Sequence, residues 1–305
     1  YYEMKLRLDL MVTEACVEYY YLTREIVVTK ENLKLLTYLE RVAQTKYTAG
    51  KGSQSDVIKA QVEMGVLEER IQSLLDMLHP AVARLNSVLN RPGNASLPPP
   101  SGLPDVDITR DETRLATWLK EHNPSLKTAL LQIKNAQTVV ELARKEYYPD
   151  TMLGIGMGTG KDSISGAMGS RRNSLMGMFS MNVPLWSQKN RAAVNEAQKM
   201  KRSTEQARKN LENELTAELQ TALFHWRDSD RKIQLYRDSL LPKARQSLAV
   251  SQRAFETGNA DFLEIVDAQR MLLELELSLE RALSNRVSSY AGIVKLTGRE
   301  RLTDD

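Results

Sequence analysis

The sequence has little of what a compact enzyme of its length usually carries. Its 305 residues include 15 glycines, 10 prolines and only 6% aromatic residues, whereas soluble enzymes draw on more glycine for turns and ligand loops. It has a single cysteine, Cys16, which excludes an internal disulfide framework and a multi-cysteine zinc or iron–sulfur site. Cys16 falls in an apolar helical stretch, where we expect it to pack as an inert side chain.

An excess of one charge is also missing. Lysine and arginine number 42 against 39 aspartate and glutamate, so the formal net charge is only +3. This balance argues against a nucleic-acid partner, which would favour a strongly basic chain. No run of about 18 apolar residues predicts a transmembrane helix. No signal peptide is visible, because residues 1–4 are already in a helical pattern.

Catalytic constellations are absent from the sequence as well. The histidines lie far apart, each on or near a predicted helix: His79, His122 and His225. Gly154, Gly156 and Gly158 resemble part of a dinucleotide loop, but the helix that should follow is missing, so they predict a strand face of small residues. We therefore expect no enzyme activity, no cofactor and no resident metal.

Long helices with coiled-coil spacing account for most of the chain. Apolar residues recur in alternating steps of four and three, which predicts coiled-coil seams. These stretches are residues 3–49, 55–90, 187–256 and 262–297. Breaks at 50–53 and 258–261 predict that consecutive helices form antiparallel hairpins with short tips. Pro80 and Pro242 should kink the helices that hold them.

The segments between the two hairpins differ in composition. Residues 91–110 hold five of the ten prolines, which predicts a stiff, extended connector. Two shorter helices should follow, over 111–122 and 124–147, with Pro124 at the start of the second.

An internal repeat relates the two helical hairpins. A shift of 208 residues places Gly50 on Gly258 and Gln61 on Gln269 without a gap. Identity, break position and heptad phase agree, so the chain holds two copies of one hairpin with the same tip. The same shift puts counterparts of the 111–186 region upstream of residue 1. We therefore expect the chain to be a fragment that starts inside a long helix.

Residues 151–186 alternate between apolar and other side chains. The expected strands are 151–160 and 174–186, separated by a glycine- and serine-rich loop with Lys161, Arg171 and Arg172. One face is apolar, and the other mixes small, polar and methionine residues. Each strand is about long enough to cross a bilayer when tilted. Alternation alone favours the plainer alternative, a hairpin that packs on a soluble core.

A set of short motifs, taken in order along the chain, resembles the TolC-like family of bacterial outer-membrane efflux proteins. The resemblance spans about residues 1–300, and its parts are YTAG (47–50), DVIKAQ (56–61), YYP (147–149), NVPLW (182–186), FETG (255–258), FLEIVDAQ (262–269) and LTG (296–298). Each motif is weak alone, whereas the order and spacing of the set are specific.

The resemblance implies a mainly α fold. Two long antiparallel coiled-coil hairpins would form the protomer of an α-barrel, and one β-hairpin would contribute to a trimeric β-barrel. The expected parts are a first-repeat hairpin (1–90), a proline-rich connector (91–110), short equatorial helices (111–150), a membrane β-hairpin (151–186) and a second-repeat hairpin (187–298). With one β-hairpin per chain, three copies supply only half of the family's twelve strands, so this chain alone should not complete the barrel.

The resemblance also implies a function, a location and partners. The expected function is a passive exit duct of a tripartite efflux or type I secretion system, located in the outer membrane and periplasm. The expected partners are two further copies in a homotrimer, a periplasmic adaptor protein, an inner-membrane transporter and outer-membrane lipid. Two rivals stay open: a periplasmic adaptor, which usually carries one helical hairpin, and a soluble coiled-coil scaffold.

The tips are the predicted functional site. In the family, acidic residues near the second tip ring the periplasmic aperture, and Glu264 and Asp267 match their positions. The helix dipole also favours acidic residues in the first turn of a helix, so these two carboxylates have a purely structural explanation as well. The same explanation applies to Asp56. Family gate bonds join an aspartate like Asp56 to a tyrosine and an arginine on the second hairpin. Phe255 and Ala260 stand at the latter two positions, which puts those bonds in doubt.

Two further groups of candidate residues complete the prediction. The glycine breaks at Gly50, Gly52 and Gly258 would admit close approach of the adaptor, as the resemblance implies. Met152, Met176 and Met178 would face the lumen of a barrel, where thioethers can hold soft cations such as Cu(I) or Ag(I). Methionine more often fills apolar surface, which is the alternative reading.

Overall fold

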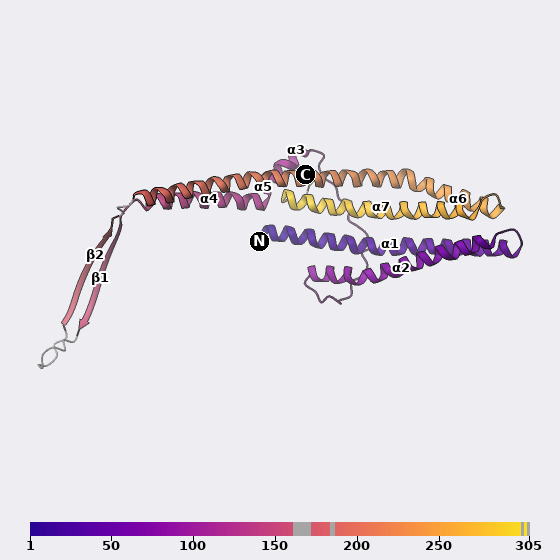
Figure 1. Ribbon diagram of the computed structural model, residues 1–305, viewed down its shortest axis with the longest axis horizontal. Helices are drawn as coiled ribbons and strands as arrows, with labels where there is room; N and C mark the ends of the chain where they lie inside the picture. Colours follow the sequence, from indigo (N-terminus) through magenta and orange to yellow (C-terminus); the bar gives the residue numbers. More distant parts are fainter. Residues whose placement is uncertain (161–171, 184–186, 300–301, 304–305) are drawn as a thin grey trace. The chain divides into compact units, whose positions relative to one another are not determined.

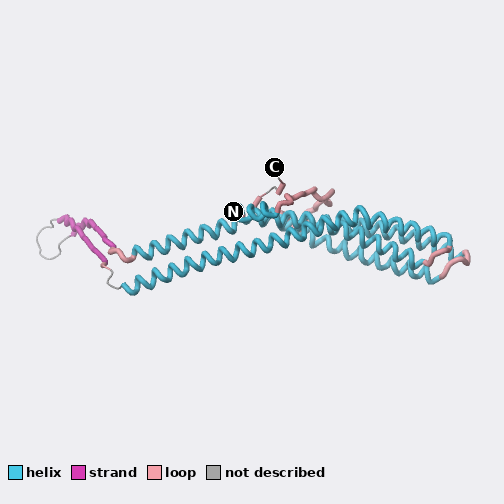
Figure 2. The backbone as a smooth tube through the Cα atoms, turned by 90° about the horizontal axis from the view of Figure 1, so that it is seen from above, coloured by secondary structure: helices cyan, strands magenta, loops and turns pink. Residues whose placement is uncertain are grey.

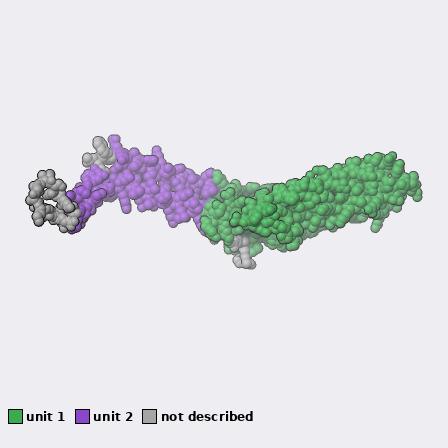
Figure 3. Space-filling view, turned by 90° about the horizontal axis from the view of Figure 1, so that it is seen from below, with its two compact units in different colours: residues 1–124, 213–305 green, residues 125–212 purple. Residues whose placement is uncertain are grey.

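The computed structural model describes residues 1–160, 172–183, 187–299 and 302–303. These form two compact units, residues 1–124 with 213–305 and residues 125–212, shown in green and purple in Figure 3. The loop residues Lys161 and Arg171, and residues 184–186 of the last strand motif, lie outside the described ranges.

Long helices build the first unit. They are α1 (Tyr2–Thr48), α2 (Gln54–Val88), the short α3 (Glu112–His122), the end of α5 (Ser187–Leu235), the π-helical turn η1 (Tyr236–Leu240), α6 (Leu241–Thr257) and α7 (Phe262–Thr297). The expected helix boundaries are confirmed to within about two residues, because glycines and capping residues fix them.

The helices of the two repeats lie side by side in the order α2, α1, α7, α6 (Figure 1). Their buried side chains form one apolar cluster near the tips, drawn from all four helices. Its members include Leu36, Leu39, Val57, Ala60, Phe255, Phe262 and Ile265. Both tips lie at the same end of this unit (Figure 2).

The two prolines within the long helices behave differently. Pro80 lies inside α2, which continues without interruption from Gln54 to Val88. Pro242 follows η1 and stands in the first turn of α6. Because proline lacks an amide N–H and its ring crowds the preceding turn, the wider π-helical turn accommodates it. The single helix expected over 187–256 is thus α5, η1 and α6 in succession.

The second unit pairs α4 (Pro124–Lys145) with the first part of α5 and carries the strands β1 (Asp150–Gly160) and β2 (Arg172–Asn182). Val140 and Ala143 of α4 pack against Ala197 of α5. The side-chain amide of Asn190 donates to the carbonyl oxygen of Glu146 at 3.0 Å, which ties the end of α4 to the start of α5.

The strands form an antiparallel pair that separates two chemical faces. Leu153 is opposite Phe179 and Met157 is opposite Leu175, so these residues share the apolar face. Leu153 and Phe179 remain 79% and 67% exposed. Within the described residues no helix covers this face. The described ranges also contain no helix with the length and apolarity needed to cross a bilayer.

Candidate functional site

The first tip is a compact glycine loop between α1 and α2. Gly50 takes a positive φ of 70°, which glycine adopts without strain. The amide of Lys51 donates to the carbonyl oxygen of Lys46 at 2.8 Å, and that of Gly50 to Tyr47 at 3.0 Å. These bonds satisfy the last carbonyls of α1, as in a Schellman motif. A Cβ on Gly52 would lie 2.9 Å from the Cβ of Lys46, so the loop approaches the helix closely there.

The second tip repeats the hydrogen bonds of the first. Gly258 has a φ of 83°. The amide of Asn259 donates to Ala254 at 2.8 Å, and that of Gly258 donates to Phe255 at 3.0 Å. These pairs match those of the first tip under the 208-residue shift. A side-chain cap then starts each following helix, from Ser53 at α2 and from Asp261 at α7.

The predicted acidic residues lie on the surface beside these loops. Asp56 is half-buried in the first turn of α2, while Glu264 and Asp267 are exposed on α7. The spacing of Glu264 and Asp267 places them on one side of that helix. The structure therefore brings two carboxylates together at the second tip. Their place in a ring remains a prediction.

Phe255 lies beneath the tips rather than on their surface. It is only 4% exposed and meets Phe262 edge to face, with ring centroids 5.6 Å apart. The ammonium of Lys46 lies 4.3 Å from the centroid of the Phe255 ring and donates to the Phe255 carbonyl oxygen. Phe255 is thus a packing group between the hairpins, and a role at an aperture remains a prediction.

The residues that join the two hairpins were missed by the sequence reasoning. Near the tips these residues include, besides Lys46, two pairs: Tyr38 donates to Glu256 at 3.1 Å, and Arg270 forms an ion pair with Glu63. The bond to Glu63 raises the pKa of Arg270 above its ordinary value. The repeat could not reveal these links, because the counterparts of Lys46 and Arg270 are Ala254 and Val62.

A second polar layer joins the helices farther from the tips. Glu280 of α7, only 8% exposed, pairs with Arg24 of α1 at 2.8 Å and accepts from the hydroxyl of Tyr20 at 3.3 Å. Burial and the Glu280 charge raise the pKa of Tyr20, while the hydrogen bond to Glu280 raises that of Arg24. Glu25 pairs with Arg70 of α2 at 2.7 Å. Charge thus holds α1 to both of its neighbours.

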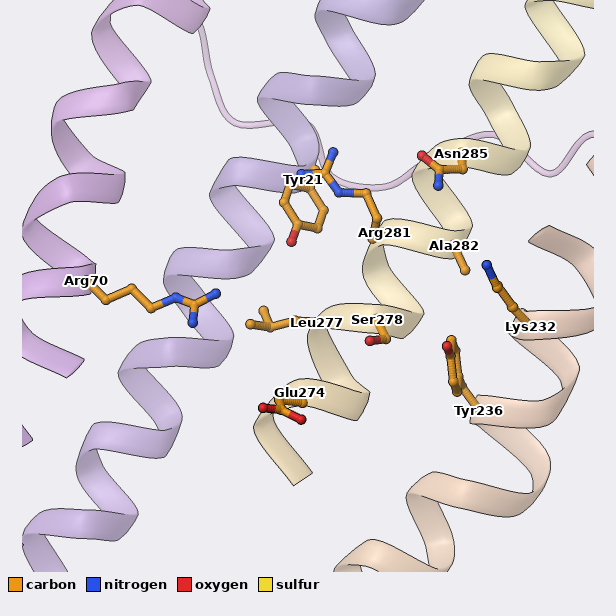
Figure 4. A pocket seen from close by; sticks show the side chains of 10 residues that line it. All are labelled: Tyr21, Arg70, Lys232, Tyr236, Glu274, Leu277, Ser278, Arg281, Ala282 and Asn285. Carbon is orange, nitrogen blue, oxygen red and sulfur yellow. The ribbon is translucent and has the colours of Figure 1, made fainter. Parts of the chain in front are cut away.

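A pocket of about 460 Å³ lies beside this layer (Figure 4). Lys232 and Tyr236 line one side of it, and Arg70 and Tyr21 line the other. Arg281 stacks over the ring of Tyr21 at 3.4 Å. Each cation already has a carboxylate partner: Glu25 for Arg70, Glu18 for Arg281 and Asp228 for Lys232. The pocket is therefore not a site of unpaired positive charge.

The predicted methionines share the mixed face of the β-hairpin. Met176 and Met178 are opposite Gly156 and Gly154, and Met152 is opposite Ser180. A Cβ built on Gly154 would lie 3.6 Å from the terminal carbon of Met178, so the methionine side chain lies across that glycine. The structure brings the three thioethers onto one surface. Among the described residues no group of histidine, cysteine or acidic side chains forms a metal site.

The chain resembles known proteins in both sequence and fold. Residues 115–299, more than half of the chain, match the family described as outer membrane efflux protein. The chain is 23% identical over 283 residues to the cobalt-zinc-cadmium resistance protein CzcC of Cupriavidus metallidurans. That alignment covers 90% of this chain and 65% of CzcC, so the chain spans about 65% of that relative's length.

Solved structures share the fold at low identity. A membrane protein from Pseudomonas aeruginosa superposes with a TM-score of 0.86 at 20% identity, covering 100% of this chain and 68% of the other. CusC, whose structures concern folding and transmembrane channel formation, gives 0.85 at 14% identity, covering 98% and 70%. This likeness confirms the expected fold of paired helical hairpins with a β-hairpin.

Proposed function

Since the chain belongs to the outer membrane efflux protein family, we propose that the protein containing it is a passive exit duct of a tripartite efflux system. It would carry small toxic compounds or metal ions from the periplasm to the outside, and it would be no enzyme. The main support is the combination of two long hairpins with matching tips and a β-hairpin whose apolar face is uncovered. CzcC is named for cobalt, zinc and cadmium resistance, which favours metal ions as cargo over proteins secreted by a type I system.

The order of the helices supports the closed ring that a homotrimer requires. Under the 208-residue shift α7 is the counterpart of α2, and α6 is the counterpart of α1. The order α2, α1, α7, α6 therefore shows the same pair of helices twice in succession, with α2 and α6 at the outer edges. The contact between repeats joins α7 to α1. When the 208-residue shift is applied to this contact, it becomes a contact between α2 of one copy and α6 and η1 of the next copy. Such a head-to-tail contact forms a closed ring when the rotation between copies closes.

The edge of α2 has the surface that this ring requires. Val266 of α7 is buried in the cluster between the repeats, whereas its counterpart Ile58 on α2 is exposed. The side-chain amide of Gln269 donates to the carbonyl oxygen of Asn32 at 3.4 Å. The 208-residue shift turns this pair into Gln61 and Leu240. We therefore place Gln61 of one copy against Leu240 in η1 of its neighbour.

The tips give the duct its periplasmic end. Three copies would bring Glu264 and Asp267 around one opening, where carboxylates attract cations. The loops at Gly50, Gly52 and Gly258 would dock a periplasmic adaptor, which links the duct to an inner-membrane transporter. The uncovered β-hairpin face would meet outer-membrane lipid. Two repeats and a β-hairpin disfavour the rival roles of adaptor and coiled-coil scaffold.

Single-channel conductance of the full-length protein in a planar bilayer tests this function. We expect steady, cation-selective pores whose selectivity falls when Glu264 and Asp267 are both changed to Ala. A matched control changes Glu68 and Glu69, which are exposed on α2 farther from the tip, to Ala and should leave the selectivity intact. Correctly folded full-length protein that forms no pores would overturn the duct and favour a scaffold or an adaptor.

A further inference from the structure

The mixed face of the β-hairpin differs from a packing surface in one respect. Between 152 and 158 it carries Met152 and three glycines, and between 176 and 180 it carries Met176, Met178 and Ser180. Methionine is therefore the only long side chain on this part of the face. The three methionines are more than half exposed, at 63%, 65% and 56%, so they fill no apolar core in the described residues.

The methionines of the opposite face provide a contrast. Met157 and Met181 lie there among Leu153, Ile155 and Phe179, all of which are suited to contact with lipid. Methionine on that face is one apolar side chain among several, as is common for this residue. Filling of apolar surface explains Met157 and Met181, but it does not explain methionines set among glycines and a serine.

The register places Met178 beside each of the other two methionines, whereas Met152 and Met176 are four ladder positions, about 14 Å, apart. Met176 and Met178 are two residues apart on one strand, so their Cα atoms are about 7 Å apart. Met152 lies diagonally across from Met178, because its direct partner is Ser180. Diagonal neighbours in an antiparallel pair are about 7–8 Å apart, within reach of long side chains. Gly154 and Gly156 place no side chain between the methionines, and Met178 extends across Gly154.

The donor set selects for one class of ligand. Thioether sulfur is soft and prefers Cu(I) and similar ions, whereas Zn²⁺ and Co²⁺ bind better to imidazole or carboxylate. Residues 151–158 and 175–181 contain no histidine, cysteine, aspartate or glutamate. Apart from the Ser180 hydroxyl, the side-chain donors on this stretch of the face are therefore neutral thioethers, and the nearest carboxylate on the face is Asp150, beyond Met152.

We propose that Met178, together with either Met152 or Met176, binds a soft monovalent cation, Cu(I) or Ag(I), on the wall of the duct. The proposal rests on the proposed function, because the duct makes this face the lumen wall. It narrows the cargo from toxic solutes in general to ions of this class, which would step along a thioether surface during export.

Cation binding to the purified full-length protein tests the site directly. Cu(I) is titrated under reducing, anaerobic conditions against a colorimetric chelator, and Ag(I) is titrated by calorimetry. We expect the triple variant Met152→Leu/Met176→Leu/Met178→Leu to bind either ion about tenfold or more weakly. The matched control, Met157→Leu/Met181→Leu on the opposite face, should bind as the wild type does. Equal binding by wild type and the triple variant, or equal losses in both variants, would overturn the site.

Conductance separates this proposal from the duct itself. If pores form normally and the triple variant still binds Cu(I) as the wild type does, the thioether site is contradicted and the duct is supported. Cu(I) binding that depends on the three methionines, in a protein that forms no pores, would retain the site and remove the duct.

Discussion

The two tips have the same backbone but different side chains beneath them. Gly50 and Gly258 both have a positive φ, and the amide-to-carbonyl bonds correspond under the 208-residue shift. Yet Lys46 reaches from the first hairpin to Phe255 in the second, and its own counterpart is Ala254. Local backbone chemistry thus repeats with the sequence, while the links between hairpins depend on residues that only one repeat has.

The largest expected effect contrasts Phe262 with its counterpart Gln54. Phe262 is fully buried against Phe255, whereas Gln54 is exposed at the equivalent position. Phe262→Ala should lower the free energy of unfolding by about 3–5 kcal/mol, because it leaves a cavity in the cluster beneath both tips. Gln54→Ala should change it by less than about 0.5 kcal/mol. Urea unfolding followed by circular dichroism measures both, and similar losses would mean that the repeats are packed alike.

The tip glycines test the backbone conformation that the two tips share. Gly50→Ala and Gly258→Ala should each cost about 1–2 kcal/mol, because alanine is strained at a positive φ. Open space surrounds both positions, so crowding adds nothing. Gly65→Ala, in the open interior of α2, is the opposite control and should be stabilising by up to about 1 kcal/mol. Unequal losses at Gly50 and Gly258, measured as shifts in the unfolding midpoint, would show that the two loops are not equivalent.

The sequence predicts the parts of this molecule that depend on local chemistry. Seam periodicity, glycine breaks and caps were enough to place the helices, and the repeat predicted that Gly50 and Gly258 would occupy equivalent loop positions. Strand alternation separated the methionine face from the apolar face before the register showed Met178 opposite Gly154. These features are determined by residues close together in the chain.

Contacts between helices could not be predicted in the same way. The pairs Arg24–Glu280 and Glu63–Arg270 join residues more than 200 positions apart. Each helix carries many charged residues with similar spacing, so the spacing does not indicate which two of them form an ion pair. Phe255 shows a related limit. The resemblance places Phe255 at the gate, but that position does not predict its packing against Phe262 and Lys46, which come from other helices. The π-helical turn before Pro242 could not be predicted from the apolar spacing either, because that spacing does not report the hydrogen-bond pattern of the backbone.

The smallest expected effect concerns the link that only one tip has. Lys46→Met keeps the aliphatic stem but removes the ammonium that faces the Phe255 ring and carbonyl oxygen. A cation over an aromatic ring contributes about 0.5–1 kcal/mol at an accessible site, so we expect a loss of about 1 kcal/mol in urea unfolding. Lys51→Met, on the exposed surface of the same tip, controls for loss of one positive charge and should be near neutral. If both variants lose the same stability, net charge rather than the contact with Phe255 accounts for the effect, and the two tips differ less than their side chains suggest.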